Sequence, residues 1–179
     1  MSRAIYWFRN IRTKQVFATM ERSVLANPRL IKGQIPVSQL PSKIRPDHWT
    51  PLVVAHGFES DRSHTDVFTL ATQPGHPLAA QTQEQKDKYR LLPNVVKRKQ
   101  DMDMIERQIA QMARTMVYLD KTESKAVSKD SPVTLFWEDD EWVGKVEEAG
   151  LQWPEWIRHG RLELKRGNII LNQELRTAK

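Results

Sequence analysis

Short apolar runs with β-favouring residues open the chain. Residues 4–8 form an aliphatic and aromatic run, and residues 15–20 form a second one. The polar segment between them, residues 9–14, contains Asn10, a residue that tolerates turn conformations. The pattern therefore predicts an N-terminal β-hairpin within residues 1–26, with a basic tip.

The same segment permits a second interpretation, because its first 20 residues hold four basic residues and no acidic one. A mitochondrial targeting peptide has that charge pattern, but it forms an amphipathic helix and is usually rich in serine. Tyr6, Trp7 and Phe8 in succession instead favour a strand. We expect a hairpin without a cleaved presequence, which could still serve as an internal targeting signal.

Prolines dominate the next segment, since residues 27–51 hold five of the ten prolines in the chain. Proline lacks a backbone N–H and restricts its own φ, so this density disfavours a long helix and a central strand. We predict an extended, basic, Pro-rich arm over residues 27–51, which could lie along a phosphate backbone. A plain surface loop is the alternative, although loops of this length are uncommon.

The clearest periodic signal lies in residues 94–121. Apolar residues there are spaced three, four or seven positions apart, which predicts one long amphipathic helix packed on a sheet. A coiled coil is the alternative, but the stripe is shorter than the three or four heptads that this structure needs. The stripe consists of Val95, Met102, Ile105, Ile109, Met112, Met116 and Leu119, widened by Ala113 and Val117.

Residues 131–179 form the C-terminal strand and helix region. An apolar strand is predicted at residues 133–137, and four consecutive acidic residues follow it, Glu138 to Glu141. Carboxylates in this position can hold a divalent metal ion or can form a solvated turn. Because neighbouring side chains point in different directions, we expect a turn that caps the following helix or pairs with a basic protein neighbour.

The composition fits one α+β domain over residues 1–179, with a small mixed sheet. The 179 residues are 39% hydrophobic and include six tryptophans, which argues for an ordered core. No apolar run approaches the ~20 residues that span a bilayer, so we expect no membrane span. The chain has no cysteine, which excludes disulfides, thiolate metal sites and cysteine nucleophiles.

Charge is concentrated at the N-terminus. The chain has a net charge of +6, and residues 1–50 alone hold nine basic residues against two acidic ones. Such a surface suits nucleic acid or an anionic membrane, and interleaved aromatic residues favour nucleic acid, where they stack on unpaired bases. The candidate nucleic-acid-binding residues are Arg3, Arg9, Arg12, Lys14, Arg22, Arg29, Lys32, Lys43, Arg45 and Trp49.

Signals for catalysis are weak. The chain has no glycine-rich nucleotide loop, and its five histidines form no metal-binding pair at helical spacing. A nuclease-like set can be assembled from Asp47 with Glu163 and Lys165, or from Asp139 and Asp140 with Lys145. This pattern is so degenerate that a chain with 22 acidic residues offers it by chance. We therefore predict neither an enzyme nor a cofactor, and keep a metal-dependent nuclease as the third hypothesis.

Three landmarks, in this order, resemble the fungal mitochondrial homologous-recombination protein family. The first is the aromatic strand that ends in Phe8-Arg9-Asn10 and is soon followed by Gln15-Val16. The second is the group Arg45, Asp47 and Trp49, directly before the apolar run at residues 52–54. The third is Trp137-Glu138-Asp139, with Trp142 close behind.

Members of that family also serve as a protein of the large mitochondrial ribosomal subunit. The resemblance thus implies a structural protein of the mitochondrial matrix that binds large-subunit rRNA and neighbouring ribosomal proteins. As an alternative, it implies a DNA-binding factor for ATP-independent homologous pairing and mitochondrial genome maintenance.

Overall fold

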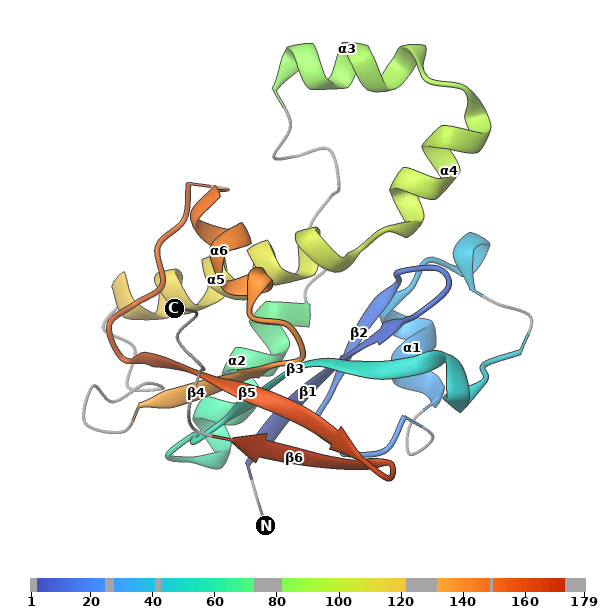
Figure 1. Ribbon diagram of the computed structural model, residues 1–179. Helices are drawn as coiled ribbons and strands as arrows, with labels where there is room; N and C mark the ends of the chain where they lie inside the picture. Colours follow the sequence, from blue (N-terminus) through green and yellow to red (C-terminus); the bar gives the residue numbers. More distant parts are fainter. Residues whose placement is uncertain are drawn as a thin grey trace.

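A six-stranded mixed sheet organises the part of the chain that the structure describes (Figure 1). This computed structural model describes residues 3–24, 28–40, 43–72, 82–121, 132–148 and 150–172. The strand order is β2-β1-β3-β4-β5-β6, and only the β4–β5 pair is parallel. Together with its helices, the sheet confirms the predicted α+β class. The strands are β1 (Ala4–Asn10), β2 (Val16–Thr19), β3 (Trp49–His56), β4 (Val133–Trp137), β5 (Ile157–Lys165) and β6 (Asn168–Asn172).

The first two strands pair as an antiparallel hairpin, with Phe8 opposite Phe17. The side-chain oxygen of Asn10 accepts hydrogen bonds from the backbone N–H groups of Arg12 and Thr13, at 2.9 and 3.1 Å. Lys14 has a positive φ of 58°. The side chain of Asn10 thus folds the tip back on itself, as Asx turns do.

The extended arm predicted for residues 27–51 is not what the structure shows. The segment contains helix α1 (Pro28–Gln34), the short 3₁₀ helices η1 (Val37–Gln39) and η2 (Pro46–His48), and the start of β3. Pro28 begins α1, where a missing N–H costs nothing. The prolines therefore mark the ends of short elements, and they do not prevent secondary structure.

Pro51 lies inside the central strand β3, which the density of prolines had argued against. Phe8 of β1 pairs with Pro51 and Trp7 pairs with Val53, so Leu52 is an extra residue between the two pairs. This irregularity is a β-bulge, one of the few places where a sheet accommodates proline. The carbonyl oxygen of Leu52 still accepts a hydrogen bond from the N–H of Glu138 at 3.0 Å, so the bulged residue connects β3 to the end of β4.

The outer edge of β2 is closed by a side chain from α1. The Gln34 amide oxygen accepts from the N–H of Ala18, and its amide nitrogen donates to the carbonyl of Ala18, both at 2.7 Å. One amide thus satisfies both backbone groups of Ala18, as a neighbouring strand would.

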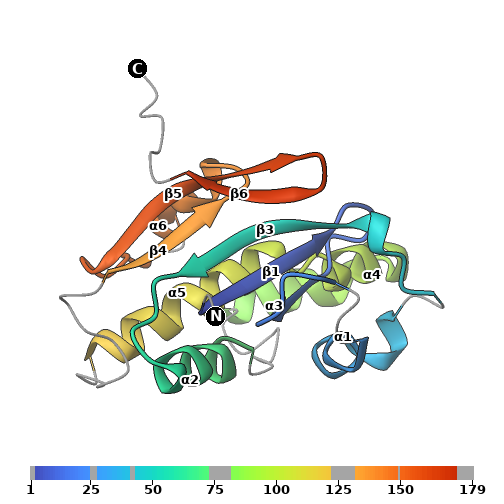
Figure 2. The ribbon, with the colours of Figure 1, turned by 90° about the horizontal axis from the view of Figure 1, so that it is seen from below.

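Helices cover one face of the sheet. Figure 2 shows α2 (Asp61–Thr72) and α5 (Ile105–Lys121) along that face. Helix α6 (Glu141–Glu148) connects the parallel strands β4 and β5 and packs against α5. The core on this side includes Trp7, Leu135 and Trp137, each at most 1% exposed.

The single helix predicted for residues 94–121 is instead two helices, α4 (Asn94–Met102) and α5. Asp103 leaves the helical region with ψ near 101°, and its carboxylate accepts the N–H of Ile105 at 3.4 Å. The N–H of Met104 bonds to the carbonyl of Lys14 at the hairpin tip, at 3.0 Å. Docking on the hairpin therefore breaks the helix. The predicted stripe is buried from Ile105 onward but not in α4, where Val95 is 69% exposed.

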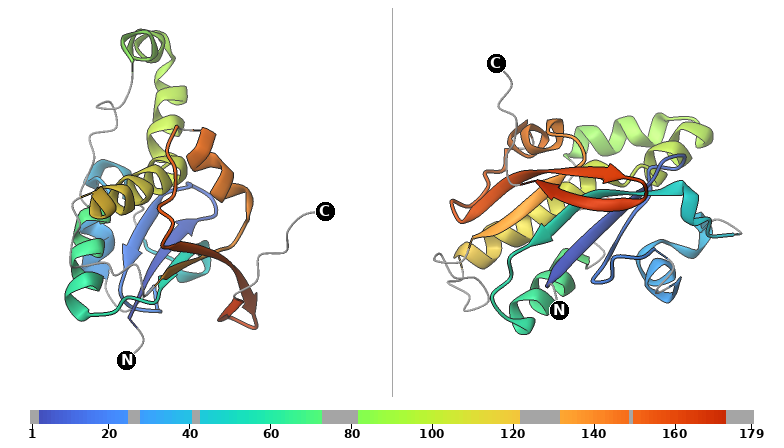
Figure 3. Two further views of the ribbon diagram at one scale, coloured as in Figure 1. Left: turned by 90° about the vertical axis from the view of Figure 1, so that its left-hand side faces the viewer. Right: turned by 60° about the horizontal axis from the view of Figure 1, so that its bottom comes forward.

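Helix α4 and the preceding α3 (Gln83–Leu91) project from the body as a helical arm, clearly visible in Figures 1 and 3. Neither helix buries a residue. The phenol of Tyr89 donates to the carboxylate of Asp101 at 2.8 Å, and the Asp101 carbonyl accepts from Arg107 at 2.7 Å. The hydrogen bond to Asp101 raises the pKa of Tyr89. Polar contacts, and not a core, set the bend of the arm.

The second face of the sheet is covered by its own last two strands, β5 and β6. The β5–β6 hairpin curls across it, as the right-hand view of Figure 3 shows. A small cluster of Ala4, Val54, Phe136 and Leu162 lies beneath, each at most 4% exposed. Gly160 allows this close approach, because a Cβ at that position would lie 2.7 Å from the Phe136 ring and 2.8 Å from the Asn172 carbonyl.

We expect Gly160→Ala to lower the free energy of unfolding by about 1–3 kcal/mol through overpacking. Gly144→Ala is the matched control: Gly144 lies in α6 with nothing within 4 Å of its would-be Cβ. There the same change should be neutral or stabilising by up to about 1 kcal/mol. Urea denaturation of the two variants measures the difference. Equal midpoints would contradict the packing described for Phe136.

A partly buried Trp–His pair links β4 to β5. The indole N–H of Trp137 donates to Nδ1 of His159 at 3.0 Å, and burial lowers the pKa of His159 from 6.5 to about 4. In the unfolded chain this imidazole takes up a proton near its ordinary pKa. Between pH 6.5 and 4 the unfolded state thus binds more protons than the folded state, so stability decreases as the pH falls.

We therefore expect the unfolding midpoint of the wild type to fall between pH 6.5 and pH 4 more steeply than that of His159→Gln, which cannot titrate. Denaturant titrations at several pH values across this window measure both slopes. Parallel slopes for the two proteins would show that His159 does not remain neutral in the folded state.

Candidate nucleic-acid interface

Arg9, the first basic residue of the hairpin proper, is occupied within the fold. Its guanidinium makes two hydrogen bonds to the Glu138 carboxylate, with Nε to Oε2 at 2.7 Å and Nη2 to Oε1 at 3.0 Å. Both side chains are only about a quarter exposed, at 28% and 26%. The hydrogen bond to Glu138 raises the pKa of Arg9. Arg9 thus ties β1 to the end of β4 and offers little to a ligand.

Arg3 and Arg22 also have partners in the fold. Arg3 pairs with Asp61 at 2.6 Å and donates to the carbonyl of Glu59 at 2.7 Å, which anchors the start of α2. The hydrogen bond from Arg3 lowers the pKa of Asp61. Arg22 donates to the carbonyl of Ile169 at 2.8 Å. Arg3 thus connects the start of β1 to α2, and Arg22 connects the end of β2 to β6, through exposed contacts.

The hairpin tip lies beside η2 and the α4–α5 junction. The N–H of Ile11 bonds to the carbonyl of His48 at 2.9 Å, and Lys14 pairs with Asp103 at 3.1 Å. Arg45 pairs with Asp47 at 3.0 Å. The two ion pairs are exposed, and exposed pairs contribute little to stability, so Lys14 and Arg45 can exchange these partners for phosphate.

Four further predicted residues are exposed cations. Within the described residues, no ion pair or hydrogen bond is found for their charged groups. They belong to the hairpin tip, to α1 and to the segment before η2, and are Arg12, Arg29, Lys32 and Lys43. Unpaired cations on an exposed surface are the groups that release counterions when they meet phosphates.

Trp49 does not belong to a stacking surface, and this prediction is wrong. The residue is 7% exposed, and its ring lies edge-on against Phe17 with a centroid distance of 4.9 Å. As the first residue of β3 it pairs with Asn10 and faces the hairpin. A base cannot reach the ring in this structure.

The helical arm adds basic residues that the sequence analysis did not select. The sequence signal for them is the basic run Lys97-Arg98-Lys99 in α4. Lys97 lies over the Tyr89 ring, 5.7 Å from its centroid, and donates to the Arg90 carbonyl at 2.8 Å. Arg98 and Lys99 are exposed. The basic residues of the arm are Lys86, Lys88, Arg90, Lys97, Arg98 and Lys99.

The four consecutive acidic residues diverge, as their alternation implies. Glu138 bonds to Arg9, while Asp139 accepts the N–H of Glu141 at 3.0 Å at the start of α6. One buried oxygen of Asp140 has no partner among the described residues. This geometry is the predicted helix-capping turn. The described residues contain no group of three or more His, Asp or Glu side chains positioned to hold a metal ion.

Comparison with known proteins gives no matching family model and no matching curated protein. In the described part of the chain, no helix has the length and apolarity needed to cross a membrane.

The two hairpin arginines should respond differently to the same substitution. Arg9→Gln should destabilise the fold by about 1–3 kcal/mol, because it leaves the half-buried Glu138 without its charged partner. Arg12→Gln should leave stability within about 0.5 kcal/mol but weaken RNA binding. Thermal unfolding and filter binding separate the two effects. If Arg12→Gln destabilised and Arg9→Gln did not, the assigned roles would be reversed.

Proposed function

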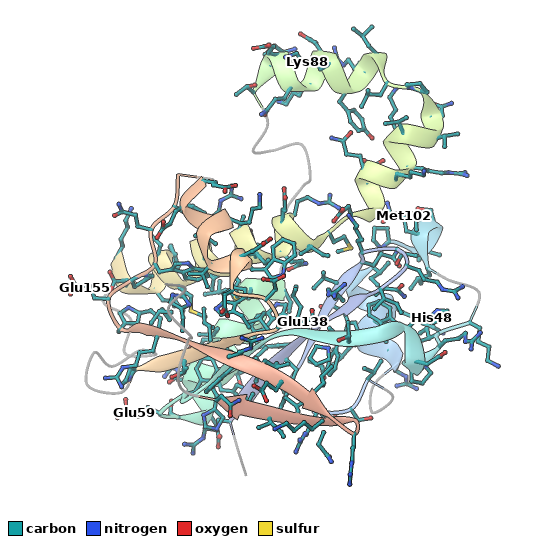
Figure 4. The ribbon with its side chains drawn as sticks, in the orientation of Figure 1. His48, Glu59, Lys88, Met102, Glu138 and Glu155 are labelled. Carbon is teal, nitrogen blue, oxygen red and sulfur yellow. The ribbon has the colours of Figure 1, made fainter. Side chains whose placement is uncertain are left out.

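We propose that the protein is a structural, rRNA-binding component of the large mitochondrial ribosomal subunit. The observation that carries this proposal is the separation of charge. Within the described residues, cations without an ion pair lie on the N-terminal half and the helical arm, while residues 139–155 hold six acidic residues against one lysine. In Figure 4, His48 beside the hairpin tip and Glu155 lie at opposite ends of the molecule.

The basic end has the features of a phosphate-binding surface. Its cations are exposed, and the pairs that some of them form are weak enough to be exchanged. The predicted aromatic partner Trp49 is buried, so binding here depends on phosphate contacts more than on base stacking. Such contacts fix position without reading sequence, which suits a protein that assembles at one place in a large RNA particle.

The helical arm fits the same role. A projection without a core of its own gains its stability from what surrounds it, and its six basic residues suit a surrounding RNA. The elbow between α3 and α4 exposes Leu91, Val95 and Val96, which a ribosomal environment would cover. In this proposal the acidic end faces away from RNA and toward neighbouring proteins.

Replacing Arg12, Arg29, Lys32 and Lys43 by Gln should weaken binding to large-subunit rRNA fragments. It should also lower the slope of log K against log salt by up to about 3, because each lost phosphate contact removes one set of released counterions. The matched control replaces Arg62, Arg114, Arg158 and Lys165, exposed or half-exposed cations outside residues 1–50. Both variants change the net charge equally.

Titrations at several salt concentrations, with duplex DNA of equal length as competitor, decide between the outcomes. Equal loss of affinity in both variants would show that binding follows net charge alone. Tighter binding to DNA than to RNA would favour the recombination-factor hypothesis. Sedimentation of the wild-type protein with the large subunit at physiological salt tests the ribosomal assignment directly.

A further inference from the structure

A cleft of about 1270 Å³ lies at the acidic end of the molecule. It is bounded by the C-terminal ends of α5 and α6 and by residues 150–156, near the position of Glu155 in Figure 4. Its apolar lining includes Val117, Val143 and Leu151, all half-buried. The RNA-binding proposal makes no use of this cleft.

Aromatic side chains form one wall of the cleft. Trp153 packs edge-on against Trp137 and against His159, with ring centroids 5.9 and 5.3 Å apart. The Trp153 indole N–H donates to the Val143 carbonyl at 3.4 Å, and that of Trp156 donates to Asp120 at 2.9 Å. Both indoles are thus fixed in orientation, and Trp153 stays partly exposed to the cleft.

His159 contributes a hydrogen-bond donor to the same wall. Its Nδ1 accepts the indole N–H of Trp137, so in the neutral ring the proton is on Nε2. Within the described part of the chain, no partner of this Nε2–H is found. Because the ring stays neutral at physiological pH, it adds no positive charge to the cleft.

The rim of the cleft is acidic. Glu147 and Glu155 are exposed, and neither carboxylate has a partner within the described residues. Asp120 uses one oxygen for Trp156 and keeps the other available. Among the described residues that line the cleft, Lys121 is the one cation. Three carboxylates against one ammonium group give the cleft a net negative charge.

We propose that this cleft binds a basic, extended segment of a partner protein. Arginine side chains of such a segment can stack on the Trp153 ring and pair with Glu147 and Glu155. An extended backbone also leaves its carbonyl groups unpaired, and one of them can accept the His159 Nε2–H. A phosphate backbone is disfavoured, since its charge has the same sign as the rim.

This assignment does not rest on the proposed RNA-binding function. It uses residues of α5, α6 and the segment from Gly150 to His159, together with Trp137 of β4, and none of these belongs to the candidate nucleic-acid interface. Experiments can therefore reject binding of a basic protein segment and still support RNA binding, or reject RNA binding and still support the protein segment.

The probe is a fluorescein-labelled peptide of ten alternating arginine and proline residues, with a glutamate–proline peptide of equal length as the negative control. Full-length protein carrying Glu147→Gln and Glu155→Gln should bind the basic peptide about tenfold or more weakly, because two charged hydrogen bonds are lost. The matched control is Glu59→Gln with Glu84→Gln, which changes the net charge equally at two exposed positions away from the cleft. It should bind as the wild type does.

A second readout locates the peptide. Nuclear magnetic resonance signals of the Trp153 and Trp156 indole N–H groups should shift on titration, and labelled RNA should leave them unchanged. Equal peptide binding by both double variants would overturn the proposal, and so would RNA-induced shifts at these indoles. If the wild type failed to bind but Arg176→Gln with Lys179→Gln bound, the occupant would be the chain's own C-terminus, which also overturns it.

Discussion

The central strand β3 is buried on both of its faces, and this condition shapes the rest of the fold. Leu52, Val53, Val54 and Ala55 are all fully buried. A strand of this kind needs apolar cover above and below the sheet. Helices α2 and α5 supply it on one face. On the other face, no helix of the described residues provides cover: the sheet curls until β5 and β6 lie over Val54, and Gly160 leaves room for the Phe136 ring.

Much of this architecture follows from local pattern. The aromatic runs of the hairpin and the apolar stripe from Ile105 to Leu119 both carry their own signals, because hydrophobic period is a local property. The helix break at Asp103 and the bulge at Leu52 do not. Both arise where a distant segment competes for a backbone group, Lys14 in the first case and Glu138 in the second. Neither hydrogen-bond partner can be predicted from the local sequence.

The candidate nucleic-acid interface likewise combines features that the sequence predicts with features that only the tertiary contacts reveal. That the N-terminal half is basic is evident from its residues, but which cations are free depends on tertiary contacts. Arg9 and Glu138 are 129 positions apart, and their pairing removes the arginine from the surface. Burial of Trp49 likewise follows from its place at the start of β3. The Trp153–His159 wall comes from the segment before β5 and from β5 itself, and only the parallel β4–β5 pairing brings Trp137 beside these residues.

The amide of Gln34 has a consequence for how the protein behaves before it finds its partners. An uncovered strand edge invites the edge of a second molecule to add to the sheet, and from there to form larger aggregates. By occupying both backbone groups of Ala18, Gln34 blocks that addition at β2 with a single uncharged side chain. Gln34 thereby protects the β2 edge of the sheet against pairing with a second molecule.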